Sequence, residues 1–382
     1  MDFDLSEEQR EFQRAVREFA EEVVAPRTEE YDRNEEFPLE VVQRMGDLGL
    51  FGLPFPSEYG GQDADLVTFC LALEEIARVD SSVAITLEAA TGLAANAVFR
   101  FGTEEQKERW LVPMARGQVL GAFAVTEAGG GSDVRALRTT ARPEDGEWVI
   151  DGAKAFITNA GTPLTKVAIV AAATAPGEIS AVLVPTDVPG FTVGPPYRKI
   201  GWRASDTREL AFHGCRVPQG NLLGERGHGY AGLLEVLDEG RIAVAALATG
   251  LARGCLEESV KYAKERQAFG RPIGAFEALQ FKIADMRVAV DASRLLYLRA
   301  AWLRDRGRPY KAEAAMAKLY SSEAAVSAAR EAVQIHGGYG YIEEFPVARF
   351  YRDAKILEIG EGTSEIQRLV IARALGLPGT EL

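Results

Sequence analysis

Apolar residues recur at helical spacing along the first third of the chain. Ser6 and Gln9 match a capping box, and Thr103 and Gln106 repeat that signal a hundred residues later. After the first cap, apolar side chains follow at intervals of three or four residues, at Phe12, Val16, Phe19 and Val23. The pattern predicts a helical N-terminal domain over residues 1–120.

The pattern changes to short β-branched runs between residues 121 and 226. One run follows an Asp145-Gly146 turn, and the segment is broken by glycines and prolines. The clearest runs cover residues 148–150, 167–171 and 179–184. We therefore predict a compact β domain in the middle of the chain.

The helical period returns after Gly227 and continues over residues 227–382. Two long helices are indicated by the apolar series Val244, Leu247, Leu251, Cys255 and Leu279, Ile283, Met286, Val290. A third is predicted from Lys311 to Ile335, ending at the stop signal Gly337-Gly338. Helices, strands and helices again predict an α+β chain with a β domain between two helical ones.

Charge and cysteine content exclude several classes of protein. The 382 residues include 56 acidic and 43 basic side chains, a formal net charge of −13 that disfavours non-specific nucleic-acid binding. Cys70, Cys215 and Cys255 lie far apart, which argues against a disulfide framework or a zinc-thiolate site. The N-terminus has acids where a secretory signal has bases, and no run approaches the roughly 20 apolar residues of a membrane span. We expect a cytoplasmic protein.

Sequence motifs give little support for a dinucleotide-binding fold, a serine hydrolase or a metal site. Residues 227–232 match G-x-G-x-x-G literally, but the preceding stretch is polar and helices follow, so these glycines are expected to open a helix. No serine lies in G-x-S-x-G. His213, His228 and His336 are too scattered for a local ligand motif, so no metal site is predicted.

Two polar segments could carry chemistry. In residues 126–133, three successive glycines at Gly129–Gly131 would let backbone N–H groups approach a ligand, although a flexible turn explains them equally. Residues 156–159 end a strand-like run. Taken alone, neither segment decides a function.

The segment around Glu361 is the most informative. Gly360 and Gly362 flank this carboxylate and leave room for a flat cofactor or a thioester beside it. Ser364 and Gln367 match a capping box that starts a helix. A helix N-terminus favours the ionised carboxylate whereas a dry pocket raises its pKa, and these opposed effects can poise a base near neutral pH. The alternative is an acidic loop that only enters a helix.

Nearly the whole chain resembles the acyl-CoA dehydrogenases, from Phe3 to Ala372. The motifs that carry the resemblance are Ala124-Val125-Thr126-Glu127 with Gly131-Ser132-Asp133, Phe156-Ile157-Thr158-Asn159, Arg266-Gln267-Ala268-Phe269-Gly270, Gln334-Ile335-His336-Gly337-Gly338, and Tyr351-Arg352-Asp353-Ala354-Lys355 followed by Glu361-Gly362-Thr363. The resemblance implies two helical domains around a small β-barrel, the second forming a four-helix bundle. It also implies FAD, an acyl-CoA substrate in fatty acid β-oxidation, an electron-transferring flavoprotein as acceptor, and a homotetramer built from two dimers.

The resemblance also implies roles for single residues. Glu361 stands where many members carry the base that removes the α-proton while the β-hydride moves to the flavin. Residues at FAD-contact positions are Phe123, Val125, Thr126, Ser132, Phe156, Ile157, Thr158, Thr363 and Glu365, with Arg266 and Phe269 toward the diphosphate and adenine. Gln334, Gly337 and Gly338 match the segment that reaches the FAD of the neighbouring subunit, and Ser132, Asp238, Arg241 and Gly362 match thioester or CoA positions.

Three departures from the family pattern matter. The loop at residues 127–132 has Ala128 where the family pattern has proline and Gly130 where it has alanine, and Glu277 stands where a glutamine is common. The isovaleryl- and long-chain-type relatives place their base at the position of Gly240, with Glu239 one residue away, so Glu361 is the better candidate. We expect short or medium acyl chains; the alternatives are a flavin oxidase or oxygenase on the same fold, or a non-catalytic helical assembly protein.

Overall fold

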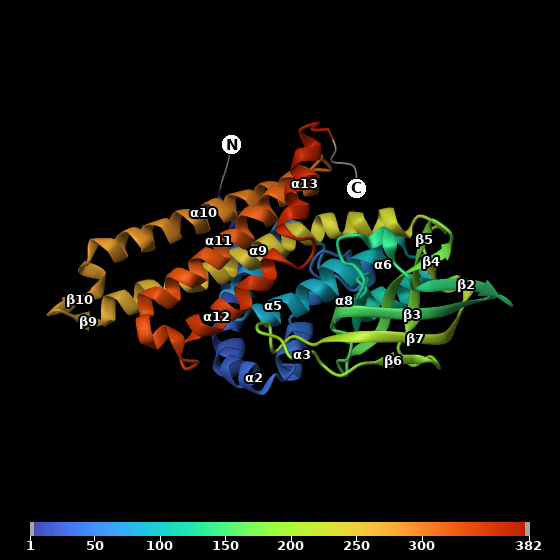
Figure 1. Ribbon diagram of the computed structural model, residues 1–382, viewed down its shortest axis with the longest axis horizontal. Helices are drawn as coiled ribbons and strands as arrows, with labels where there is room; N and C mark the ends of the chain where they lie inside the picture. The colour runs from blue at the N-terminus through green and yellow to red at the C-terminus, as the bar shows by residue number, and fades with distance from the viewer. Residues whose placement is uncertain (1–3, 379–382) are drawn as a thin grey trace.

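The computed structural model describes residues 4–378, and its elements follow the expected order of helices, strands and helices. The first three and last four residues of the predicted terminal domains, including Phe3, lie outside the described residues. In Figure 1 the sheet occupies one end of the long axis, and the long helices α9, α10 and α11 extend toward the other.

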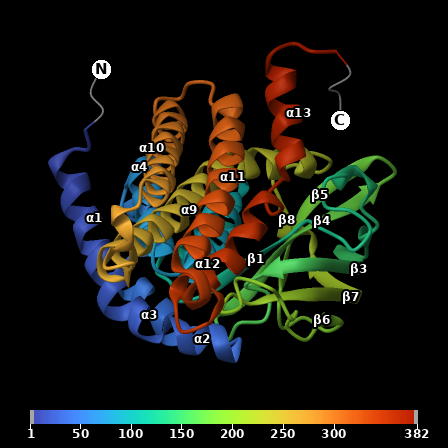
Figure 2. The ribbon, with the colours of Figure 1, turned by 60° about the vertical axis from the view of Figure 1, so that its left-hand side comes forward.

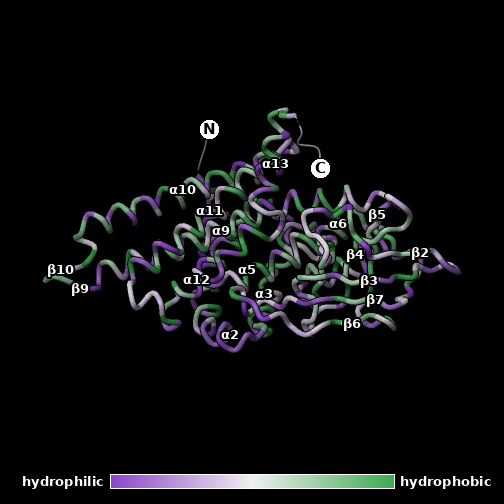
Figure 3. Tube along the Cα trace, in the orientation of Figure 1, coloured by the Kyte–Doolittle hydropathy of each residue, from purple (hydrophilic) through white to green (hydrophobic). Residues whose placement is uncertain are grey.

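Short helices form the N-terminal part. They are α1 (Glu7–Phe19), α2 (Thr28–Asn34), α3 (Leu39–Asp47), α4 (Leu66–Ala77), α5 (Ser81–Glu88), α6 (Asn96–Phe101), α7 (Glu104–Gln106) and α8 (Val112–Ala115). Both predicted capping boxes are confirmed, with Ser6 capping α1 and Thr103 capping α7. Hydrophilic positions dominate α2 at the edge of the molecule (Figure 3).

The middle part is one mixed sheet of eight strands. They are β1 (Leu120–Ala124), β2 (Thr140–Glu144), β3 (Glu147–Thr158), β4 (Thr165–Ala175), β5 (Glu178–Pro185), β6 (Phe191–Val193), β7 (Thr207–Pro218) and β8 (Leu222–Leu223). The order is β6-β7-β3-β2-β4-β5-β8, with β1 parallel to β4. Asp145 and Gly146 both have positive φ in the β2–β3 turn, as the predicted turn requires.

Long helices form the C-terminal part. They are α9 (Gly229–Glu265), α10 (Glu277–Asp305), α11 (Lys311–His336), α12 (Pro346–Ala354) and α13 (Ser364–Ala374), with the short hairpin β9 (Gln267–Ala268) and β10 (Arg271–Pro272) between α9 and α10. The glycines after Gly227 do open a helix, and Gly337 ends α11 with φ of 61°. Figure 2 shows α12 and α13 beside α11, with the sheet to the right of these helices.

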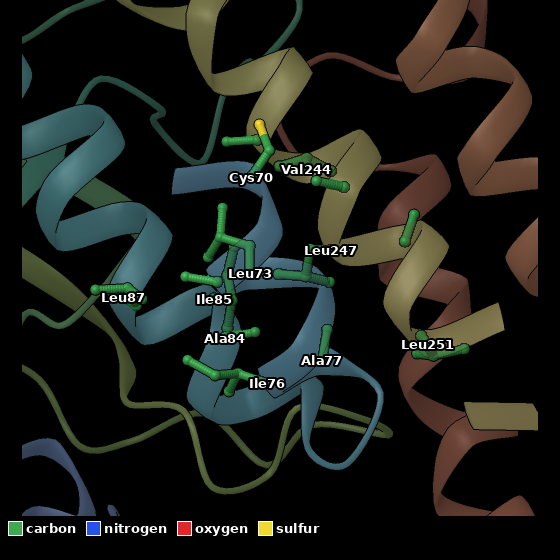
Figure 4. Packing of buried hydrophobic residues seen from close by; sticks show 14 of the residues in the cluster. Cys70, Leu73, Ile76, Ala77, Ala84, Ile85, Leu87, Val244, Leu247 and Leu251 are labelled. Carbon is green, nitrogen blue, oxygen red and sulfur yellow. The ribbon is translucent and has the colours of Figure 1, made fainter. Parts of the chain in front are cut away.

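The central core joins the two helical parts. Leu73 and Ile76 of α4 and Ile85 of α5 pack with Leu247 and Leu251 of α9 (Figure 4), and all five are at most 4% exposed. Cys70 and Cys255 belong to this core and Cys215 lies inside the sheet, so all three thiols are buried and free. The apolar faces predicted for α9 and α10 are therefore the surfaces that hold the chain together.

One expectation about membranes needs correction. The continuous helical stretch Ser81–Phe101, formed by α5, the π-helical segment η5 (Ala89–Ala95) and α6, is long and apolar enough to cross a bilayer. However, 89% of its most apolar window is buried inside the structure, against α9 and β1. The run is apolar because it is a core helix of this fold.

Candidate active site

The loop before α13 holds Glu361 in an unusual conformation. Glu361 has φ of 52° and Gly362 has φ of 92°, so two successive residues are left-handed. A residue other than glycine adopts this conformation only at a cost of roughly 1–2 kcal/mol, which the surroundings must offset. The structure thus bends the loop sharply and turns the carboxyl group of Glu361 inward.

The start of α13 differs from the expected capping box. Thr363, not Ser364, is the N-cap, because its hydroxyl accepts the backbone N–H of Ile366. Gln367 instead turns back and donates from Nε2 to the Gly362 carbonyl at 2.9 Å. The helix therefore begins one residue earlier in the pattern than the sequence motif suggested, and Gln367 supports the Glu361 loop.

Glu361 points at a gap left by Gly240 on α9. A Cβ atom built on Gly240 would lie 2.5 Å from Oε2 of Glu361 and 3.4 Å from Oε1 of Glu88. Both carboxyl groups therefore meet beside this glycine. A larger residue at position 240 would displace the carboxyl group of Glu361 from its present position.

Glu239 is occupied elsewhere. Its carboxylate pairs with Arg100 at 2.7 Å and with Arg304 at 3.0 Å, and it accepts a hydrogen bond from Asn96 at 3.1 Å. These three contacts occupy both oxygens of the Glu239 carboxylate.

Two cations approach Glu361 from other helices. Lys318 of α11 donates from Nζ to the Gly362 carbonyl at 2.8 Å, and Arg241 of α9 pairs with Asp238, whose other oxygen lies 3.2 Å from Lys311. Asp238, Arg241 and Gly362, predicted to contact the thioester or CoA, thus lie on the same side of the site as the candidate base. Nε of Arg241 is buried without a hydrogen-bond partner among the described residues, and remains free for a ligand.

The protonation states follow from burial and neighbouring charge. Burial raises the pKa of Glu88 well above its usual range, and the Glu361 carboxylate raises it further. Burial also raises the pKa of Glu361, while the adjacent Glu88 carboxyl group and the charges of Lys318 and Arg241 lower it. In this pair Glu88 therefore keeps the proton and Glu361 is the carboxylate, more basic than an exposed one.

The predicted flavin-contact residues meet at one end of the sheet. Thr126 follows β1 and accepts the backbone N–H of Ala155 at 2.9 Å, which places it beside Phe156 in β3. Phe156 is 63% exposed, has φ of 60° at a register shift, and stacks on Tyr197 with ring centroids 5.1 Å apart. Among residues 4–378 the hydroxyls of Thr126 and Thr158 make no internal hydrogen bond. An exposed aromatic ring beside free hydroxyls fits a flat polar cofactor.

Two other predicted flavin contacts, Ile157 and Ser132, differ in how far their side chains are exposed. Ile157 is 2% exposed inside the sheet core, so only its backbone can reach a ligand. Ser132 lies in an exposed loop, as do Gly129 and Gly130. Glu127 anchors that loop, since it pairs with buried Lys154 at 2.8 Å and accepts the N–H groups of Arg138 and Thr139.

The Glu361 loop and the end of the sheet that carries the predicted flavin contacts are joined through α5 and α12. Asn159, which follows Thr158, donates to the Thr86 carbonyl at 3.1 Å, and Glu88 lies two residues further along the same helix. Asp353 of α12 accepts from Trp202 at 2.6 Å and from Ser81 at 2.9 Å. These buried contacts fix the distance between the candidate base and the flavin-contact residues.

A second group of predicted FAD contacts lies at the opposite end of the molecule. Arg266 ends α9, and its guanidinium lies 5.5 Å from the ring centroid of Tyr339 in the segment after Gly338. Phe269 is 94% exposed in the β9–β10 hairpin, which Figure 1 places far from the sheet. Arg241 and Arg266 are separated by roughly 37 Å of helix. The structure therefore groups Arg266 and Phe269 with Gln334, Gly337 and Gly338, away from this chain's own Glu361.

An open groove of about 800 Å³ lies between the β4–β5 hairpin and the start of α9. Arg135, Arg142 and Tyr230 are among its lining residues, and the Arg135 guanidinium lies 5.1 Å from the centre of the Tyr230 ring. Arg142 is paired with Asp151 at 2.9 Å, so Arg135 beside the aromatic ring is the arginine of this groove that could meet an anionic ligand.

Sequence reasoning missed Glu88, Lys318 and Tyr197. Glu88 and Lys318 are each 0% exposed. Glu88 is the only charged residue of α5, and a lone charge in an apolar helix is a usable signal because its burial needs a reason. Lys318 gave no such signal, since α11 carries several other charged residues. Tyr197 gave no signal, since only the folded chain brings it to Phe156.

Comparison with known proteins agrees with this geometry. Models of the acyl-CoA dehydrogenase N-terminal, middle and C-terminal domains match residues 6–118, 122–215 and 227–376. A probable acyl-CoA dehydrogenase, YngJ of Bacillus subtilis, is 48% identical over 98% of this chain and 100% of its own length. The butyryl-CoA dehydrogenase structure from Megasphaera elsdenii is 42% identical and superposes with a TM-score of 0.96, covering 98% of this chain and 100% of that one.

A glutaryl-CoA dehydrogenase structure from Mycobacterium smegmatis in complex with FADH2 is also similar, at 32% identity and a TM-score of 0.93, over 97% of this chain and 95% of that one. The chain belongs to the acyl-CoA dehydrogenase family. It is an FAD-dependent oxidoreductase that introduces an α,β double bond into acyl-CoA thioesters.

Proposed function

We propose that Glu361 is the base that removes the α-proton of a short-chain acyl-CoA. The observation that carries this proposal is an inward-facing carboxylate between a proton-holding acid, Glu88, and two cations, Lys318 and Arg241. Burial makes Glu361 a stronger base than an exposed glutamate, and the cations keep it ionised. When bound, FAD accepts the β-hydride of the substrate at N5.

The chain's other residues would hold the cofactor and the thioester. Val125, Thr126, Thr158 and the ring of Phe156 would receive the flavin, with Phe123 and the backbone of Ile157 behind them. Thr363 and Glu365 at the start of α13 would add contacts beside the base. Gly362 and Arg241 lie where a thioester would approach Glu361, and Ser132 lies in the loop that leads toward the Arg135 groove.

We assign the Arg135 groove to the nucleotide end of CoA. Its phosphates are anionic, and Arg135 would supply positive charge that the chain as a whole lacks. Tyr230 offers a face on which a base can stack. This assignment would place the thioester inside and the nucleotide at the surface.

We also propose that two copies build each FAD site. The distance between Glu361 and the group of Arg266 and Phe269 prevents one chain from supplying both, so the latter would serve the neighbouring subunit. Exposed apolar residues seven positions apart on α10 support self-association: Phe281, Val288, Leu295 and Trp302, between 44% and 66% exposed. A homotetramer of two dimers, located in the cytoplasm, is the assembly we propose.

The relatives indicate the substrate and the acceptor. The butyryl-CoA dehydrogenase among them favours a four-carbon or similarly short acyl chain. We propose an electron-transferring flavoprotein as acceptor in fatty acid β-oxidation. A flavin oxidase would instead consume oxygen stoichiometrically during turnover, and this measurement separates the two.

The base is tested by anaerobic titration with acyl-CoAs of increasing length, following loss of the oxidised flavin absorbance. Wild-type protein should bleach most readily with short chains. Glu361→Gln should keep bound FAD but lose reduction by 10³-fold or more, because the amide cannot accept the proton. Unchanged reduction in Glu361→Gln would refute the assignment, and Glu361→Asp, with a shorter reach, should retain partial activity.

A further inference from the structure

Lys318 is a buried lysine that the proposed reaction does not use directly. Its side chain is 0% exposed, although lysine is almost never fully buried unless it is paired. Within residues 4–378 its Nζ makes one hydrogen bond, to the Gly362 carbonyl at 2.8 Å, and no ion pair shorter than 4 Å. A buried ammonium with a single neutral partner is costly and needs a compensating role.

The partner of Lys318 is the carbonyl that ends the strained turn. Glu361 and Gly362 are both left-handed, so their peptide must be held from outside. Two donors converge on the Gly362 oxygen, Nζ of Lys318 and Nε2 of Gln367 at 2.9 Å. Gln367 alone could hold the turn as a neutral donor, and what Lys318 adds is charge.

That charge acts in a small set of ionisable groups. Glu361 is faced by Glu88 from α5, Lys318 from α11 and Arg241 from α9. Lys318 is faced by Glu361 and Arg241, by Glu358 in the 3-10 segment η11 (Lys355–Glu358), and by Glu365 in α13. Burial lowers the pKa of Lys318 to about 8, which the Glu361 carboxylate opposes, so the lysine is still mainly cationic at neutral pH.

We propose that Lys318 is a positioning residue for Glu361, which clamps the turn through the Gly362 carbonyl and keeps the neighbouring carboxylate ionised in a dry site. This inference rests on the proposed role of Glu361 as the base. It explains how a carboxylate can be enclosed next to a second acid and still be ready to accept a proton. Lys318 reaches the reaction only through Glu361 and its loop.

The test measures the titration of Glu361 itself. In FAD-loaded protein, the infrared absorption of its protonated carboxyl group is followed against pH and identified by its loss in Glu361→Gln. Lys318→Met removes charge and hydrogen bond at similar length, and Lys318→Gln removes the charge but keeps a donor. Lys282→Met, which removes a lysine paired with Glu331 at the surface of the same bundle, is the control.

Both Lys318 variants should raise the titration midpoint of Glu361 by about one pH unit or more, as expected when a nearby cation is lost. Flavin reduction should fall about tenfold at pH values below the wild-type midpoint, with the acid limb of its pH profile displaced equally and the KM for acyl-CoA little changed. Lys282→Met should leave the midpoint in place. An unchanged midpoint in Lys318→Gln overturns the electrostatic role, even if Lys318→Met fails to fold.

The titration result for Lys318 can be distinguished from failure of the proposed role of Glu361. If Glu361→Gln still reduces its flavin normally, the assignment of Glu361 fails while the titration still reports on Lys318. If Glu361→Gln is inactive and the midpoint does not move, the base stands and the role of Lys318 is overturned.

Discussion

Two carboxyl groups, Glu361 and Glu88, share the inner end of the site. Glu88 is fully buried and Oε2 of the half-buried Glu361 is inaccessible to water, so two anions here would repel each other strongly. The cations Lys318 and Arg241 lie near Glu361, and the raised pKa of Glu88, due to burial first and to Glu361 second, leaves the proton on Glu88. The difference in proton affinity between these two glutamates thus arises from their neighbours, since the side chains themselves are identical.

Replacement of Glu88 should affect the pH profile in a way that depends on the substitute. Glu88→Gln keeps a neutral group with N–H donors beside Glu361, so the profile of kcat/KM should change little. Glu88→Leu removes the polar neighbour that lowers the pKa of Glu361, so that pKa should rise and the acid limb should move to higher pH. Equal shifts in both variants would show that Glu88 is not a neutral donor in the wild type.

At the scale of elements, the turn into α13 depends on one cap. Thr363→Ala removes the hydroxyl that accepts the Ile366 N–H, and it should lower the free energy of unfolding by about 1 kcal/mol. Ser364→Ala, which follows the sequence motif but removes no cap, should cost less. Urea unfolding of both variants measures the difference, and a larger loss in Ser364→Ala would contradict the observed cap.

Asp353 links α12 to α5 and to the segment before β7. Burial raises its pKa to about 6, while Arg349 opposes that shift. The folded protein therefore binds more protons at this site than the unfolded chain between about pH 4 and 6, so Asp353 makes stability fall as pH rises through this window.

Asp353→Asn should remove this contribution while keeping an acceptor for the Trp202 N–H. As pH rises from 4 to 6, the unfolding free energy of the variant should increase relative to that of wild type by on the order of 1–3 kcal/mol. Parallel stability curves for the two proteins across that window would contradict the raised pKa.

At the scale of the whole molecule, the predicted FAD residues divide into two distant groups. Arg266→Ala should lose FAD because it removes a contact to the neighbouring subunit's cofactor, and Glu361→Gln should keep FAD but lose activity. Hybrids formed by refolding or coexpressing the two variants should regain activity, since half of their sites combine an intact Glu361 with an intact Arg266. FAD content and turnover of the separated hybrid measure this.

Hybrids without activity would place Arg266 and Glu361 in the same chain's site. As a matched control, Arg271→Ala changes another arginine of the same exposed hairpin, whose guanidinium lies 4.3 Å from the Phe276 ring centroid. It is expected to retain FAD.

Local patterns were sufficient for most of the fold. Apolar spacing located α9, α10 and α11, and the caps at Ser6 and Thr103 formed as expected, because these features depend on neighbours three or four residues away. The cap at α13 shows the limit of such patterns. Ser364 and Gln367 matched a motif, but the left-handed turn at Glu361 and Gly362 brings the Gly362 carbonyl to Gln367, which bonds it instead.

The sequence by itself determined the order of the three parts, the family resemblance and the candidate base, because motifs such as Gly360-Glu361-Gly362 are contiguous in the chain. Only the tertiary structure decided the partners of that base. Glu88, Gly240 and Lys318 come from three different helices, and they meet Glu361 only after the core has packed. Proton affinity depends on burial and on charges across space, so the proton affinity of the Glu361 carboxyl group is set by the fold.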